Sequence, residues 1–138
     1  MMDGQDRNRI EQLLYRSFWL IDHGRAAECA ALFAPDASLT FGPGAPQPGT
    51  IHGPAIATAM AARQAQVAVT SRHILSNIIV EDEGEGRATM RSLLTLFRTD
   101  TDDRRPIVKS VADIEDAVVK MGGEWKIAAR TIQPIFHP

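Results

Sequence analysis

The chain has 138 residues, 44% of them hydrophobic, a formal net charge of −2 and a single cysteine. A chain of this length buries roughly two-thirds of its unfolded surface, which is enough for one domain with an internal pocket. Acidic and basic residues are interspersed, and no stripe of Lys and Arg follows the pattern of a phosphate backbone, so a nucleic-acid partner is not expected.

The first residues, "MMDGQDRNRIEQ", are polar and charged, and the sequence has no apolar run of membrane-spanning length. We therefore expect no signal peptide, no membrane contact and a cytoplasmic protein. Cys29 cannot form an internal disulfide. In the run "AAECAALFA" it is expected to be a small buried hydrophobe, with a nucleophile as the alternative.

Two helices are predicted at the start of the chain. Between residues 6 and 22, apolar side chains recur at three- and four-residue steps, which is the pattern of an amphipathic helix that Gly24 would end. These side chains are Ile10, Leu13, Leu14, Phe18 and Ile21. A shorter helix fits residues 26–33, since Ala, Glu and Leu favour helices and Pro35 prevents a long continuation.

A strand, a loop and a third helix are predicted next. "PDASLTFG" begins the strand, and residues 42–50 hold three prolines and three glycines, which is typical of a loop. Pro54 suits the first turn of a helix, where no amide donor is needed, and this helix would run through "AIATAMAARQAQ".

After Thr70 the sequence reads as strands joined by short turns. Successive strands with short connections predict an antiparallel meander, and helices followed by a sheet predict an α+β domain whose helices cover one face of a curved sheet. The four predicted strand segments are residues 71–83, 86–100, 105–121 and 124–136.

Alternation in the first of these segments places His73, Leu75, Asn77 and Ile79 on one face of the sheet. The other face would carry Ile74, Ser76, Ile78 and Val80. Neither set is polar enough to face water alone. One face is expected to pack on the helices, and the other to be covered by a second copy of the chain in a homodimer.

The order and spacing of five segments resemble the SnoaL-like branch of the nuclear transport factor 2-like superfamily, which includes scytalone dehydratase, ketosteroid isomerase and polyketide cyclases. The resemblance implies a single cone-shaped α+β domain over residues 1–138, with a core of about 8–136 and three N-terminal helices on a curved, mostly antiparallel sheet. The segments are "IDHGR", "LFAPDASL", "IHGPAI", "SRHILSNIIVE" and "IEDAVVKMGGEWKIAAR".

Asp22 and His73 are the candidate catalytic residues. A carboxylate in the last turn of a helix faces the negative end of the helix dipole, which costs up to about 1 kcal/mol and calls for a compensating partner. Taken alone, the two residues could be a solvated acid and a satisfied core or surface histidine. The resemblance implies a pair, as in scytalone dehydratase-like sites, in which Asp22 orients His73 and His73 moves a substrate proton.

Other parts of the relatives' sites are not carried over. The second histidine and the asparagine of scytalone dehydratase-like sites fall near Arg98 and Ile114 in this sequence, and the tyrosine and acid of ketosteroid isomerase-like sites fall at Ser17 and Phe41. The resemblance therefore implies only a minimal Asp-His pair in an apolar setting.

The pocket wall is expected to be apolar. For Tyr15, packing against the second helix is an equal alternative to lining the pocket. The predicted lining residues are Tyr15, Phe18, Trp19, Ile21, Phe41, Met60, Leu75 and Phe97.

The remaining polar residues are expected to have structural roles or to lie in solvent rather than to catalyse. Asp116 and Arg130 are expected to pair across strands rather than to catalyse. His52 is expected to lie in a loop or where the third helix starts, and His23 and His137 to be solvated. No ligand spacing supports a metal site, including one made of His52, His73 and Asp22, and we expect neither a metal nor a cofactor.

The sequence thus predicts a small cofactor-independent lyase or isomerase for an apolar, cyclic carbonyl or hydroxyl compound. The alternative is a non-catalytic ligand-binding or assembly module of the same fold, similar to the small subunits of ring-hydroxylating dioxygenases. That alternative predicts a cone filled by side chains such as Trp19 and Met60.

Overall fold

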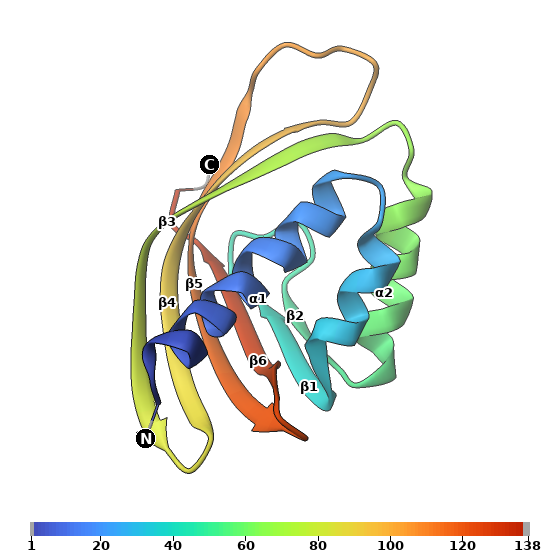
Figure 1. The fold of residues 1–138 in the computed structure, drawn as a ribbon. Helices are drawn as coiled ribbons and strands as arrows, with labels where there is room; N and C mark the ends of the chain where they lie inside the picture. The colour runs from blue at the N-terminus through green and yellow to red at the C-terminus, as the bar shows by residue number, and fades with distance from the viewer. Residues whose placement is uncertain (1, 137–138) are drawn as a thin grey trace.

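The computed structural model describes residues 2–136 and confirms the α+β class. One face of the curved sheet is covered by the long first helix, with the second α-helix beside it (Figure 1). We call the covered face the inner face and the opposite one the outer face. The elements are α1 (Gly4–Asp22), η1 (Ala26–Leu32), β1 (Phe33–Phe41), β2 (Gly49–His52), α2 (Pro54–Ala65), β3 (Thr70–Gly84), β4 (Arg87–Thr99), β5 (Val108–Met121) and β6 (Glu124–Pro134).

The first helix forms because its start is capped and one side is apolar. Asp3 and Asp6 make a reciprocal capping box, in which each side chain accepts a hydrogen bond from the backbone N–H of the other residue. Asp6 also accepts hydrogen bonds from Trp125 Nε1 at 3.0 Å and Lys120 Nζ at 3.2 Å, and these bonds hold its pKa at about 2. The predicted apolar stripe is buried except for Ile21, which is partly buried, and Gly24 follows the helix with a positive φ of 76°.

The six strands have the order β2-β1-β6-β5-β4-β3. The predicted antiparallel meander is confirmed for β3 to β6, and β1 joins it through parallel pairing with β6. Two details differ from the sequence prediction. Residues 26–32 form a 3₁₀-helix, and the end of the predicted loop forms the short strand β2, because the "GTIH" segment pairs antiparallel with β1.

A bulge in β3 overturns the expected alternation after Ser76. Ser76 pairs with Leu93 and Ile79 pairs with Arg91, so β3 takes one more step than β4 between the two pairs. Asn77 provides this extra residue with a left-handed φ of 54°. Ile79 is consequently on the outer face and 56% exposed, whereas Val80 is on the inner face and 8% exposed.

The core lies between α1, η1, α2 and the inner face of the sheet. Its most deeply buried apolar side chains come from elements far apart in the sequence and form one continuous cluster. Among them are Ile10, Leu14, Ile56, Met90, Ile114 and Ile127. Within residues 2–136, neither α-helix has the length and apolar character needed to cross a bilayer.

Candidate functional site

The structure brings Asp22 and His73 into direct contact. Asp22 is the last residue of α1, and His73 lies near the start of β3 on the inner face. His73 Nδ1 is 2.6 Å from Asp22 Oδ1, and the His73 backbone N–H donates to Asp22 Oδ2 at 2.8 Å. The side chains are 5% exposed for Asp22 and 12% for His73, so the pair is largely shielded from water but not sealed.

Two further side chains support the carboxylate. Ser71 Oγ donates to Asp22 Oδ1 at 2.7 Å, and Arg63 Nη2 from the last turn of α2 donates to Ser71 Oγ at 2.9 Å. Because a guanidinium can only donate, Ser71 must accept from Arg63 and give its single hydroxyl proton to Asp22. Arg72 Nη1 also donates to the Asp22 carbonyl oxygen at 3.1 Å, which occupies an acceptor left open at the end of the helix.

These donors keep the carboxyl of Asp22 ionised. Burial is the largest single influence and opposes ionisation. The hydrogen bonds and charge of His73, together with Ser71, outweigh it and lower the pKa of Asp22 below its ordinary value of 3.8. The helix-end cost expected from the sequence is thus offset by a complete set of hydrogen bonds.

The ionised carboxylate also decides the tautomer of His73. A carboxylate cannot donate, so the proton in the short contact must sit on Nδ1 of the imidazole. In the neutral ring Nε2 then carries the lone pair, and Nε2 has no hydrogen-bond partner among residues 2–136. Phe18 packs beside the imidazole with the ring centroids 4.7 Å apart.

Asp116 and Arg130 form a buried ion pair deeper in the core. Arg130 Nε and Nη2 donate to the two carboxylate oxygens of Asp116 at 2.7 and 3.0 Å, and Nη1 donates to Ser17 Oγ at 2.9 Å. The guanidinium carbon lies 4.9 Å from the centroid of the Phe18 ring. The two residues face each other across β5 and β6, which agrees with the structural role predicted for them.

The predicted pocket residues differ in how deeply they are buried and in the face of the sheet on which they lie. Phe18 and Met60 are buried in the core, while Ile21, Phe41 and Leu75 are partly buried against it. Tyr15 and Trp19 are 40% and 64% exposed on α1, because they lie away from the stripe that packs on the sheet. Trp19 stacks on His23, which caps the end of the helix.

Phe97 lies on the opposite face of the sheet from His73. His73 pairs with Leu96, and Phe97 pairs with Arg72, so Leu96 holds the inner position next to the candidate base. The cause is register: the sequence shows the alternation within β4 but does not show which residue of β4 faces which residue of β3.

Two cavities, of about 550 and 130 Å³, do not include Asp22 or His73 in their walls. The larger one is a hollow on the outer face, with Ile79, Arg91, Leu93, Asp113 and Glu115 in its wall. The smaller one lies beneath residues 104–107.

The other titratable candidates lie apart from the pair. His52 is exposed at the end of β2, and His137 lies outside the described residues. Cys29 is buried, and burial raises the pKa of its thiol to about 11, with the charge of Arg130 acting in the opposite sense. Within residues 2–136, His, Cys, Asp and Glu side chains do not gather in a group that could hold a metal ion.

Sequence reasoning missed Ser71 and Arg63. The position of Ser71 could have been predicted, because a residue two positions before His73 on a strand lies on the same face of the sheet. The position of Arg63 could not, since only the folded chain shows that the end of α2 lies beside the start of β3.

The chain matches the family model of the SnoaL-like domain over residues 3–131. No curated protein matches the sequence. Many solved structures are similar in fold, among them the following three. A variant of Rv3472 from Mycobacterium tuberculosis, a protein of unknown function, is 23% identical with a TM-score of 0.79, and the match covers 96% of this chain and 78% of that one.

A candidate scytalone dehydratase from Novosphingobium aromaticivorans is 22% identical with a TM-score of 0.81, over 95% of this chain and 85% of that one. ActVI-ORFA from Streptomyces coelicolor is 18% identical with a TM-score of 0.75, over 93% and 96%. Likeness at these identities shows the fold. The match to the family model over most of the sequence shows more than the fold: the chain belongs to the SnoaL-like domain family.

Proposed function

We propose that the protein is a cofactor-independent lyase or isomerase in which the Asp22–His73 pair moves a substrate proton. The observation that carries the proposal is the 2.6 Å contact between Asp22 Oδ1 and His73 Nδ1, because it fixes the tautomer that leaves Nε2 unprotonated in the neutral ring. The resemblance to scytalone dehydratase-like proteins, which have an acid and a histidine at the corresponding places, supports the same class of reaction.

In this mechanism His73 Nε2 removes a proton from a carbon next to a carbonyl group. The electron pair of the broken C–H bond forms a C=C bond, and the π pair of the C=O bond moves to the oxygen to give an enolate, while Asp22 balances the charge of the imidazolium. Return of the proton to another carbon completes an isomerisation. Transfer to a neighbouring hydroxyl, which then leaves as water, completes a dehydration. The apolar side chains around His73 favour an apolar, cyclic substrate.

Proton exchange tests the proposal without knowledge of the natural substrate. With β-tetralone in deuterated water, we expect the protein to accelerate loss of the NMR signals of the protons next to the carbonyl group. His73→Gln should remove the acceleration, and Asp22→Asn should reduce it by about 10²- to 10⁴-fold, the range typical of general acid–base groups.

His52→Gln is the matched control, since it removes an exposed imidazole at the end of β2. Exchange by this variant should equal that of the unmodified protein. If no enolisable ketone in a panel of cyclic ketones exchanges faster with the protein than with His73→Gln, the catalytic proposal is wrong.

A non-catalytic binding or assembly module is the second candidate. Of the two side chains expected to fill the cone in this case, Met60 is buried, whereas Trp19 is 64% exposed and does not fill it. The burial of Phe18 and the position of the larger cavity on the outer face also favour this candidate. A folded protein that binds cyclic ketones but never accelerates their exchange would support this candidate over the first.

We also propose that two copies of the chain associate through the outer face. Ile74 and Ile79 on the edge strand β3 and Val108 at the start of β5 are each more than half exposed, so the outer face carries apolar side chains that a partner could cover. Arg91 lies beside Asp113 and Glu115 in the hollow on the same face, so each copy offers both signs of charge to a partner related by a two-fold axis.

A further inference from the structure

Arg63 is a charged group beside the Asp22–His73 pair that the proposed proton transfer does not use. Its guanidinium is partly buried and donates through Nη2 to Ser71 Oγ, a neutral acceptor. Among residues 2–136, no carboxylate lies within ion-pair distance of Arg63. A guanidinium has several N–H donors in a planar fork, and one of them is bonded here, so most of its binding capacity is open.

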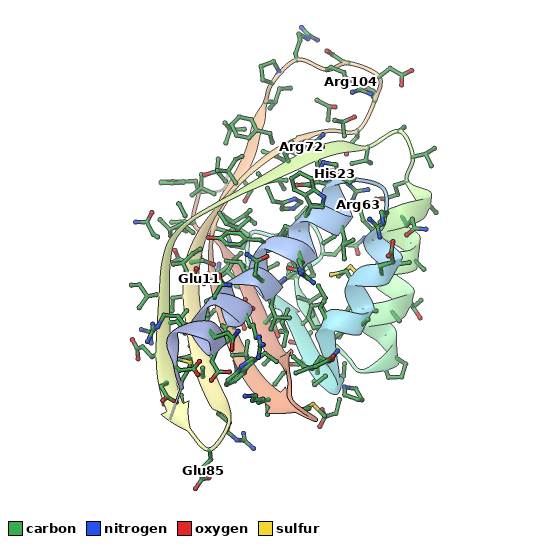
Figure 2. All side chains as sticks on the ribbon, in the orientation of Figure 1. Glu11, His23, Arg63, Arg72, Glu85 and Arg104 are labelled. Carbon is green, nitrogen blue, oxygen red and sulfur yellow. The ribbon has the colours of Figure 1, made fainter. Side chains whose placement is uncertain are left out.

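Two more arginines surround the same place. Arg98 faces Ser71 across the β3–β4 pairing and is bound to Asp100 Oδ1 at 2.6 Å. Arg72 donates to the carbonyl oxygens of Asp22 and Ser71. We call Arg63, Arg72 and Arg98 the arginine cluster. Figure 2 shows Arg63 and Arg72 at the end of the molecule where α1 and α2 end and β3 begins.

The charges of the cluster do not cancel. The acids facing it are Asp22 from α1 and Asp100 after β4, so three positive charges meet two negative ones when His73 is neutral. Partial burial, followed by the nearby charge of Arg98, lowers the pKa of Arg63, while Asp22 and Asp100 act in the opposite direction. Arg63 is thus held in an unfavourable place for a cation, next to another cation, without an anion of its own.

An arginine in the last turn of a helix also interacts favourably with the negative end of the helix dipole, and it could serve only to dock α2 on β3. That role accounts for its position and for the bond to Ser71. It does not account for the remaining donors or for the unbalanced charge.

We propose that the site takes a substrate with a carboxylate group, which binds to the open donors of Arg63 while the apolar part of the molecule lies against His73. This inference rests on the proposed function for the location of the substrate. It adds a class of substrate, namely an aromatic or cyclic carboxylic acid, and a residue that selects it. A carboxylate matches the planar fork of a guanidinium and would balance the excess charge.

Binding of two matched probes tests the inference. β-Naphthoate and β-naphthamide have nearly the same shape, but only the first carries a charge. We expect calorimetric titration at neutral pH and low salt to give at least about tenfold tighter binding of the naphthoate, the gain expected from one charge-assisted hydrogen bond. Arg63→Met should abolish this preference, and Arg63→Lys, which keeps the charge, should retain part of it.

Arg16→Met is the control for general electrostatics, because it removes one positive charge from an exposed position on α1. It should leave the preference for naphthoate unchanged. Equal affinity of the unmodified protein for the two probes would overturn the inference, as would an unchanged preference in folded Arg63→Met.

His73→Gln separates this inference from the proposed function. The variant should keep the preference for naphthoate while losing the exchange of β-tetralone protons. If the preference is found but the unmodified protein shows no proton exchange, the carboxylate site stands and the catalytic proposal is wrong. If proton exchange is found without the preference for naphthoate, the catalytic proposal stands and the carboxylate site is wrong.

Discussion

Arg130 is the largest fully buried side chain of the structure, and it is charged. Its burial is possible because the two oxygens of Asp116 and the hydroxyl of Ser17 accept its protons, and because the rings of Phe18 and Phe33 lie near the guanidinium. Phe18 therefore separates a permanent cation from the imidazole of His73, which becomes a cation in the proposed mechanism. The buried ion pair thus packs against Phe18, whose ring also lies beside His73.

Removing one member of this pair should be far more harmful than removing both. Asp116→Ala leaves a buried guanidinium without a counter-charge, and we expect the free energy of unfolding to fall by about 3–5 kcal/mol. The double variant Asp116→Leu with Arg130→Met replaces the pair with apolar side chains of similar size and should recover much of the loss. Urea unfolding followed by circular dichroism measures both, and a single variant as stable as the unmodified protein would contradict this account.

The bulge in strand β3 determines which of its side chains face the helices and which face outward. Before Asn77 its alternation faces His73 and Leu75 inward, as the sequence predicts, and after the bulge the alternation is reversed. A strand without the bulge would expose Val80 and bury Ile79. The bulge thus allows one strand to place His73, the candidate base, on the inner face at one end and to bury Val80 in the core at the other.

Asn77 should tolerate glycine but not a β-branched residue. Its φ of 54° lies in the left-handed region, which Asn and Gly adopt most readily. Asn77→Gly should leave stability nearly unchanged, whereas Asn77→Val should lower the free energy of unfolding by about 1–2 kcal/mol. The neighbouring Ser76→Val, at a paired and exposed strand position, serves as the control in the same urea titrations. Equal stabilities of the valine and glycine variants would show that the bulge stores no strain.

Strand β3 also shows which parts of the structure the sequence could predict and which it could not. Helix periodicity and turn residues are local signals, so α1, α2 and the four strands of the meander could be identified from them. The bulge, the pairing of Leu96 with His73 and the parallel contact of β1 with β6 depend on register between strands, which local signals do not specify.

Some residues of the candidate site could also be predicted from the sequence, and others could not. The acid and the histidine were predictable, because the resemblance places both residues, and the structure joins them. Arg63 was not, since its contact with Ser71 arises only when the end of α2 reaches β3. The exposure of Tyr15 and Trp19 was also hidden, because their spacing from Asp22 on the helix does not show how the helix is rotated on the sheet.

At the scale of the whole molecule, the outer face should govern the oligomeric state. We expect the protein to sediment as a dimer at micromolar concentration, and the double variant Ile74→Glu with Ile79→Glu to sediment as a folded monomer, because like charges would then meet across the interface. Val67→Glu alters an apolar side chain that is 91% exposed between α2 and β3, and it should leave the dimer intact. A monomeric unmodified protein would rule out the proposed association.

The parallel pairing of β1 with β6 would allow the candidate site to be assembled from two separate fragments of the chain. A cut in the turn between α2 and β3 would leave Asp22 and Arg63 on one fragment and Ser71 and His73 on the other. Neither fragment would contain the pair, yet the first would carry the strand that joins β6 of the second. The proposed proton transfer would then measure how well the two fragments associate, since the pair is formed only when they reassemble the sheet.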